Sequence, residues 1–363
     1  MASLTKRLLA AGFAAVATIT VASLSAELYL RRHPLPSVPV RGLQSDPLLG
    51  WDSIPRIVPL DNAGRARVVY FVGDSFTQDR RWPFIAQREA EKQGVAFDGY
   101  SLGVSGFGTT QEWLKTERDF EFYRPQLVVV QLFAWNDLRD NWSYPPIAYS
   151  PDASNRPYLV PTASGFRLAP AVSAARPMRW LIDSALWRQV LFRATLRIDD
   201  TAARAGIDRL ADWHLALPVH YTEPATWEPF YRRDGYETAY VRGAFAVTRE
   251  AFRRLSTFLS ARGAKLIVIG LDNPFTVDED VARAWIRPGT PFDPNLPLSR
   301  VAAFLREDGV PFESARPALL DARRRTGRKV YNPPAGELSG HLEPAGEEAF
   351  GTVAARMIVS LRP

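Results

Sequence analysis

The stretch Val-Val-Tyr-Phe-Val-Gly-Asp-Ser-Phe-Thr, residues Val68–Thr77, decides the fold. It opens with a continuous apolar run rich in β-branched and aromatic residues, which is typical of a strand buried on both faces of a parallel sheet. The run ends at Gly73, and Asp74 and Ser75 follow. A serine at this point lies at the carboxyl end of the strand, where open α/β sheets bind ligands. Ser75 is therefore a candidate nucleophile, although serine is also a common helix cap.

The residues that follow alternate between helix and strand patterns. Helical spacing is found over Trp82–Gln93 and Thr110–Phe122, and further strands are predicted over Val95–Leu102 and Leu127–Phe133. This βαβαβ alternation predicts a three-layer α/β/α fold with a doubly wound parallel sheet.

The remaining chain is divided into a tether, an insertion and the rest of the core. Residues 33–64 are rich in proline and predict an extended tether on the surface of the domain. The main domain is expected over 65–363, with a large insertion at about 141–235 that carries several tryptophans over the active face. The core is predicted to resume with a helix over Thr238–Arg262, a strand over Lys265–Gly270, and helices over Leu298–Asp308 and Pro344–Leu361.

Residues 1–32 predict a membrane-targeting segment. Lys6 and Arg7 precede an uncharged run from Leu8 to Ala26, which is close to the ~20 residues that span a bilayer core. The small residues Ser23–Ala26 also suit cleavage by a signal peptidase. Signal anchor and signal peptide stay open as alternatives. Either one exports the domain to the periplasm or the cell exterior, and an anchor would leave it on the membrane through this helix.

The composition excludes several classes of site and partner. There is no cysteine, so disulfides and thiolate nucleophiles are excluded. The four histidines do not show metal-ligand spacing, so neither a catalytic metal nor a cofactor is expected. The net charge of +6 is spread among acidic residues without a basic stripe, so nucleic acid is not an expected partner.

Motifs at three other places complete a pattern with Ser75. Gly103–Thr109 follows the second predicted strand, Phe133–Asp137 ends the third, and Gly340–Gly346 precedes the last helix. These four blocks resemble, in order, those of the SGNH (GDSL-like) hydrolase superfamily, which bear a serine, a glycine, an asparagine and a histidine. The resemblance covers about residues 65–363 apart from the insertion, and implies a flavodoxin-like SGNH fold.

The resemblance implies Ser-His nucleophilic catalysis. A hydroxyl is a poor nucleophile until a base takes its proton, and His341 is the expected base for Ser75. The backbone N–H groups of Ser75 and Gly106 and the side-chain amide of Asn136 are the expected oxyanion hole, each worth about 3 kcal/mol of barrier. Three flanking side chains are candidate substrate contacts: Asp74, Trp135 and Asp137.

Each assignment has an ordinary alternative. Asn136 can be a turn former, since Asn-Asp pairs favour turns. Gly106 can be a flexible link in a glycine-rich loop, and Gly103 is the alternative candidate for the glycine of the second block. His341 can cap the last helix.

The chain departs from the family pattern at two positions. The Asp that usually stands three residues before the histidine is replaced by Leu338. Glu337 is the candidate orienting acid if the loop is one residue longer, with Ser339 the other polar neighbour; a Ser-His dyad oriented by a backbone carbonyl is the alternative. Trp135 stands where a glycine commonly precedes the asparagine.

The predicted function is a serine esterase acting on O-acyl groups, foremost O-acetyl groups, of an envelope or extracellular carbohydrate. Export and the aromatic insertion motivate the sugar. An exopolysaccharide O-acyltransferase using the same acyl-serine, and a lipid esterase or thioesterase, are alternatives. A non-catalytic envelope protein that binds a glycan or a partner is a further alternative, favoured by the missing Asp.

Overall fold

The computed structural model describes most of the main domain. The described residues are 18, 21–25, 29, 43–78, 80–141, 156–162, 164–169, 228–237, 239–286, 289, 291–332 and 340–361. Most of the predicted targeting segment lies outside them. Of the helices within these ranges, none combines the length and the apolar character that crossing a membrane requires.

The main sheet has six strands in the order β10-β9-β6-β4-β5-β3. Its parallel strands are β4 (Val68–Val72), β5 (Asp98–Ser101), β6 (Leu127–Phe133), β9 (Lys265–Leu271) and β10 (Phe312–Ser314). In chain order they run 2-1-3-4-5 across the sheet, the doubly wound order of flavodoxin-like folds. The predicted fold class is confirmed, and the topological switch point lies between β4 and β6.

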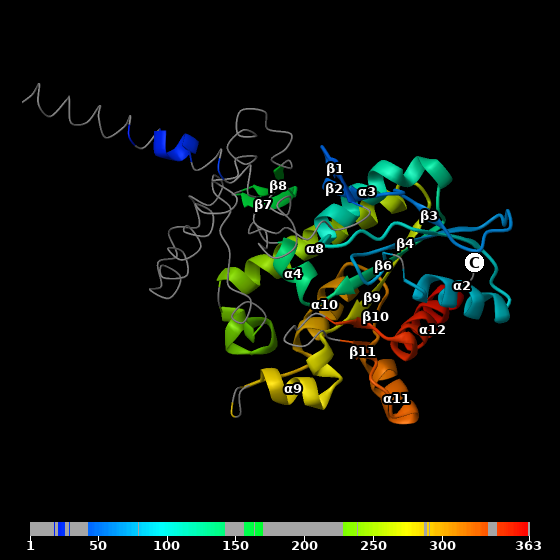
Figure 1. The fold of residues 1–363 in the computed structure, drawn as a ribbon. Coiled ribbons are helices and arrows are strands. Elements are labelled where there is room, and N and C mark those ends of the chain that lie inside the picture. The colour runs from blue at the N-terminus through cyan, green and yellow to red at the C-terminus, as the bar shows by residue number, and fades with distance from the viewer. Residues whose placement is uncertain are drawn as a thin grey trace, which may run out of the picture.

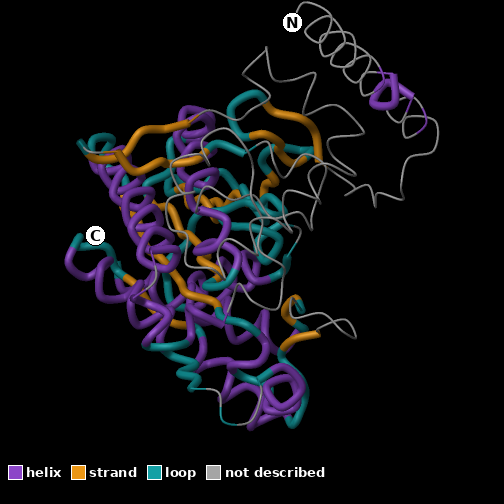
Figure 2. The backbone as a smooth tube through the Cα atoms, turned by 90° about the vertical axis from the view of Figure 1, so that its left-hand side faces the viewer, coloured by secondary structure: helices purple, strands orange, loops and turns teal. Residues whose placement is uncertain are grey.

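Helices cover both faces of this sheet (Figure 1). On one face lie α2 (Trp82–Lys92), α11 (Arg316–Thr326) and α12 (Pro344–Ser360); on the other lie α3 (Thr109–Tyr123), α8 (Ala239–Ser260) and α10 (Leu296–Glu307). The turned view in Figure 2 shows the strands running between the helices. The short helix α4 (Asn136–Asn141) directly follows β6, and α9 (Glu279–Trp285) follows β9 and the turn η7 (Pro274–Thr276).

The core lies between the sheet and these two helical layers. Every residue of β6 is buried, because a central parallel strand is covered on both faces. This burial is the physical reason for its continuous apolar run. The candidate site is expected beyond this apolar core, at the carboxyl ends of the parallel strands.

Residues 43–59, assigned from sequence to the tether, contain three short strands. β1 (Leu43–Asp46) and β2 (Gly50–Ser53) make an antiparallel hairpin, and β3 (Val58–Pro59) pairs with the edge strand β5. Leu49 and Trp51 are buried in the main core. The segment is therefore part of the domain. Its burial comes from distant partners rather than from a periodic pattern of its own.

The described part of the predicted insertion includes a second hairpin. It consists of β7 (Tyr158–Thr162) and β8 (Gly165–Ala169). Two short 3-10 helices, η5 (Glu228–Tyr231) and η6 (Asp234–Glu237), lead into α8. The tryptophans on which the sugar prediction drew lie outside the described residues: Trp142, Trp180, Trp187, Trp213 and Trp227.

Candidate active site

Ser75 lies in a tight turn directly after β4. The backbone oxygen of Asp74 accepts hydrogen bonds from the N–H groups of Thr77 and Gln78, each at 3.0 Å. The Asp74 side chain accepts one from the Phe76 N–H at 2.8 Å, as aspartates do in turns. The chain therefore reverses at once and leaves Ser75 half-buried at the carboxyl end of the strand.

The backbone N–H groups of Ser75 and Gly106 donate to no acceptor among the residues that the structure describes. Their neighbours differ: the N–H groups of Phe76, Ser105 and Phe107 all donate within the protein. An oxyanion hole requires donors that point at the reacting oxygen and are not already engaged. The two predicted backbone donors meet the second of these requirements.

The two candidate glycines of the second block serve different purposes. Gly106 has φ +76°, a conformation that side-chain-bearing residues rarely adopt. A Cβ on Gly103 would lie 2.3 Å from the Gln78 backbone nitrogen, so Gly103 permits two loops to pack closely. This division supports Gly106 as the donor position.

Asn136 is joined to the nucleophile turn by a buried hydrogen bond. Its Nδ2 donates to Asp74 Oδ2 at 2.6 Å, across the switch point between β4 and β6. Asp74 Oδ1 accepts from Phe76 N–H and, with the Gln131 amide nitrogen turned toward it, from Gln131 at 2.9 Å. The second Nδ2 hydrogen of Asn136 has no recorded acceptor in the described part of the chain, so it can serve an oxyanion.

His341 lies on β12 (His341–Leu342), which pairs with β11 (Tyr331–Asn332). Its ring is 4.9 Å from the ring of Phe76, the residue after the nucleophile. Arg80 connects the same two regions, because its Nε donates to the Ser75 backbone oxygen at 3.1 Å and its charge acts on His341. The first and last sequence blocks therefore meet at this edge of the sheet.

The electrostatic environment keeps His341 neutral. Burial of the ring and, as the smaller cause, the positive charge of Arg80 together lower the pKa of His341 to about 4. A neutral imidazole can accept a proton, so the ring is in the state that a general base requires at neutral pH.

The orienting group of this ring is the least defined part of the site. No carboxylate hydrogen-bonds to His341 within the ranges that the structure describes. Glu337, Leu338 and Ser339 lie outside those ranges. Glu337 as the orienting acid therefore stays a prediction.

The three side chains named from sequence as substrate contacts are buried. Asp74 and Asp137 are fully inaccessible, and Trp135 is 2% exposed. With Glu112 the two aspartates form an inner acidic cluster, in which burial is the first cause of a raised pKa for each carboxyl group. The pKa of the Asp74 carboxyl group rises to about 6. Such burial favours a supporting role beneath the oxyanion hole over contact with substrate.

Several side chains of the site were missed by sequence reasoning. Gln131 is the one polar residue in the otherwise apolar β6, and that isolation is a signal that could have identified it. Arg80 lies five residues after Ser75 in the chain but belongs to none of the four sequence blocks. Arg156 is 1% exposed and donates to the Gly106 carbonyl at 3.2 Å, a contact that no local pattern predicts.

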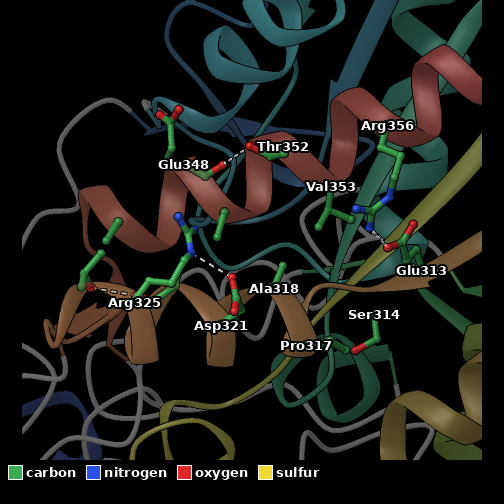
Figure 3. A pocket seen from close by; sticks show the side chains of 14 residues that line it. Glu313, Ser314, Pro317, Ala318, Asp321, Arg325, Glu348, Thr352, Val353 and Arg356 are labelled. Atoms are coloured by element: carbon green, nitrogen blue, oxygen red, sulfur yellow. Dashed lines mark hydrogen bonds and ion pairs between the residues drawn. The ribbon is translucent and has the colours of Figure 1, made fainter.

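A separate groove lies between α11 and α12 (Figure 3) and measures about 480 Å³. Of the four sequence blocks, only Ala345 lines this groove, and it belongs to α12. Charges on its rim are paired with each other, as in Arg325 with Asp321 and Arg356 with Glu313. The chemistry of the four blocks therefore lies elsewhere.

Comparisons with known proteins place the chain beside solved esterase structures. An acetyl xylan esterase matches at 13% identity and TM-score 0.38 over 81% of this chain and 100% of its own. A lipase/acylhydrolase from Enterococcus faecalis matches at 13% and 0.38 over 81% and 96%. An acetylxylan esterase from Geobacillus stearothermophilus matches at 10% and 0.39 over 83% and 97%.

No protein-family model and no curated protein sequence matches the chain. The solved structures that match it include structures described as GDSL-like lipases and as a lipase/acylhydrolase. The fold assignment itself rests on the order of the parallel strands in this chain.

Proposed function

We propose that this chain is a serine ester hydrolase of the SGNH type, with Ser75 as nucleophile and His341 as base. The observation that carries the proposal is that the N–H groups of Ser75 and Gly106 are unengaged among the described residues, while the Asn136 amide is fixed to Asp74, the residue before the nucleophile. Preorganised donors of this kind are what acyl transfer requires at the developing oxyanion.

The first half of the reaction forms an acyl-enzyme. Neutral His341 takes the hydroxyl proton while Ser75 Oγ attacks the ester carbonyl carbon. The carbonyl oxygen becomes an oxyanion and is stabilised by the N–H groups and the Asn136 amide. The tetrahedral intermediate then collapses, the C–O bond to the alcohol breaks, and the imidazolium returns its proton to the leaving alkoxide.

The second half regenerates the enzyme by the same groups. His341 removes a proton from water as the water oxygen attacks the acyl-serine carbonyl. Collapse of the second tetrahedral intermediate breaks the bond to Ser75 Oγ, which takes the proton from the imidazolium. One ester and one water give one alcohol and one carboxylic acid.

The substrate and the location complete the proposal. The apolar run after Lys6 and Arg7 supports export, with the domain held at the membrane or released outside the cytoplasm. The tryptophan-rich insertion supports a carbohydrate that carries O-acetyl groups, because indole faces stack on sugar rings.

The proposal is tested with purified protein on p-nitrophenyl acetate and on acetylated polysaccharide. Wild type should release p-nitrophenol and acetate, and Ser75→Ala and His341→Ala should each lose at least about 10³-fold in kcat/KM. The matched control is Ser299→Ala, an exposed serine on α10. If wild type is no faster than Ser75→Ala on every ester, the hydrolase assignment is wrong.

The products also separate hydrolysis from transfer. Hydrolysis releases one acetate for each ester cleaved. Acetyl transfer to an added glycan without matching release of acetate would instead identify an acyltransferase that uses the same serine.

A further inference from the structure

We propose that Trp51 is a positioning residue of the oxyanion hole, an inference that rests on the proposed function. Trp51 lies on β2, in the segment assigned from sequence to a tether. Its indole Nε1–H donates to the backbone oxygen of Ser105 at 2.9 Å. Ser105 and Gly106 share the peptide group to which the expected oxyanion donor belongs.

The geometry of a peptide group transmits this contact. The Ser105 carbonyl and the Gly106 N–H lie in one plane and, in a trans peptide, point in opposite directions. The cis bond recorded in the described chain is Ile54–Pro55, so the 105–106 peptide is trans. By holding the Ser105 oxygen, the indole directs the Gly106 N–H away from itself.

Without this restraint the peptide has a reason to rotate. Gly106 has φ +76°, and glycine crosses between backbone conformations at little cost. The Gly106 N–H makes no hydrogen bond to the described residues that would hold it in place. The Ser105 residue is therefore restrained by the indole contact at its carbonyl and by the bond from its N–H to Gln78.

Trp51 is itself held firmly enough to act as a template. It is 5% exposed and packs edge-on against Phe107, with ring centroids 5.8 Å apart. The guanidinium of Arg156 lies 5.1 Å from its ring centre and also donates to the Gly106 carbonyl. The Trp51 indole thus contacts two residues of the loop, Ser105 and Phe107, and the arginine that binds the Gly106 carbonyl.

The direct test is Trp51→Phe, which keeps an aromatic ring and removes the N–H donor. Removing an oxyanion donor outright costs about 10²–10³-fold in kcat, so loosening one should lower kcat by about tenfold or more with KM within about twofold. The matched control is Trp113→Phe, because the indole of the similarly buried Trp113 donates to the Glu117 side chain within α3 and not to the loop of Gly106.

The result is read together with folding and with a covalent probe. The melting temperature should stay close to wild type, and labelling of Ser75 by a fluorophosphonate should slow in parallel with kcat, since its tetrahedral product also places an oxygen in the hole. A Trp51→Phe enzyme that keeps wild-type kcat and labelling rate would overturn the proposal.

A second measurement uses the wild-type protein alone, so it does not depend on whether a variant folds. An oxyanion bound at the Gly106 N–H polarises the shared peptide and strengthens the indole bond to Ser105. In wild-type protein with 15N-labelled indoles, phosphonylation of Ser75 should therefore shift the Trp51 indole signal and leave that of Trp113 in place. An unmoved Trp51 signal on fully labelled protein would contradict the role.

The two proposals fail in different ways. If wild type neither hydrolyses esters nor reacts with the fluorophosphonate at Ser75, the hydrolase function is wrong. If Ser75 reacts and turns over normally while Trp51→Phe behaves as wild type, only the positioning role is wrong.

Discussion

His341 should remain a base in more acidic solution than an exposed histidine would. Its pKa of about 4 places the acid limb of kcat/KM near pH 4, since only the neutral ring accepts the serine proton. Activity is therefore expected to be fully present at neutral pH and to fall as the pH drops through about 4. A pH profile of p-nitrophenyl acetate hydrolysis measures this, and a limb at the ordinary histidine value of about 6.5 would contradict it.

Arg80→Gln should move the acid limb of the kcat/KM profile to higher pH. The positive charge of Arg80 is the second cause of the lowered pKa of His341, after burial. Removing the charge raises the pKa, so the limb shifts to higher pH but stays below about 6.5 because burial remains. Arg81→Gln is the matched control, because Arg81 does not contribute to the shift of His341. An unmoved limb in Arg80→Gln would rule out the coupling.

Asn136 and Asp74 should act as one unit. Asn136→Ala removes an oxyanion donor and is expected to lower kcat about 100-fold. Asp74→Asn places a donor opposite either Asn136 Nδ2 or the Phe76 N–H, so it should also lower kcat, with KM little changed. Stopped-flow or steady-state kinetics of both variants and of exposed Asn295→Ala tests this. A wild-type kcat for Asp74→Asn would show that Asn136 needs no anchor.

At the scale of elements, the β1–β2 hairpin is fastened to α3 by buried charges. Lys115 is fully buried and its Nζ lies 2.6 Å from Asp52 on β2 and 3.3 Å from Asp119. Arg118 pairs with both aspartates and with Asp46 on β1. These ion pairs hold the hairpin against α3, and the hairpin in turn places Trp51 against the loop of Gly106.

Lys115→Met should therefore destabilise the domain strongly. It leaves carboxylates buried with one cation fewer, and breaking a buried pair costs about 3 kcal/mol or more. Urea unfolding followed by circular dichroism measures the loss. Lys92→Ala, which removes an exposed pair with Glu89, should change stability by less than about 0.5 kcal/mol. Equal stabilities for the two variants would contradict the role of the network.

At the scale of the whole molecule, the domain should begin at residue 43 and not at residue 65. A chain that starts at residue 43 keeps Leu49, Trp51 and Leu60 in the core. A chain that starts at residue 65 loses all three, each worth about 1.5–3 kcal/mol of burial, and leaves Lys115 without Asp52.

The first of these chains should melt cooperatively and the second should be unfolded or aggregate. Differential scanning calorimetry of the two proteins makes the comparison. A cooperative transition of similar temperature in the shorter chain would show that residues 43–64 are dispensable, as a tether would be.

Much of the fold is predictable because its pattern is local. The strand predicted over Leu127–Phe133 coincides with β6, and the helix predicted over Trp82–Gln93 ends one residue later than α2. By contrast β10 and α11 were not predicted. The strand has three residues, and the helix shows a strongly charged surface with few buried positions, so neither has a clear apolar period.

The sequence by itself determined the alternation of strands and helices and the chemical identity of Ser75, Gly106, Asn136 and His341, since both follow from residue types at short spacing. Only the tertiary structure decided what holds those groups. The partner of Asn136 is 62 residues away and that of Trp51 is 54 residues away. Such pairs form because packing brings distant polar atoms into one dry space, where each must find a partner, and no local pattern records which one it finds.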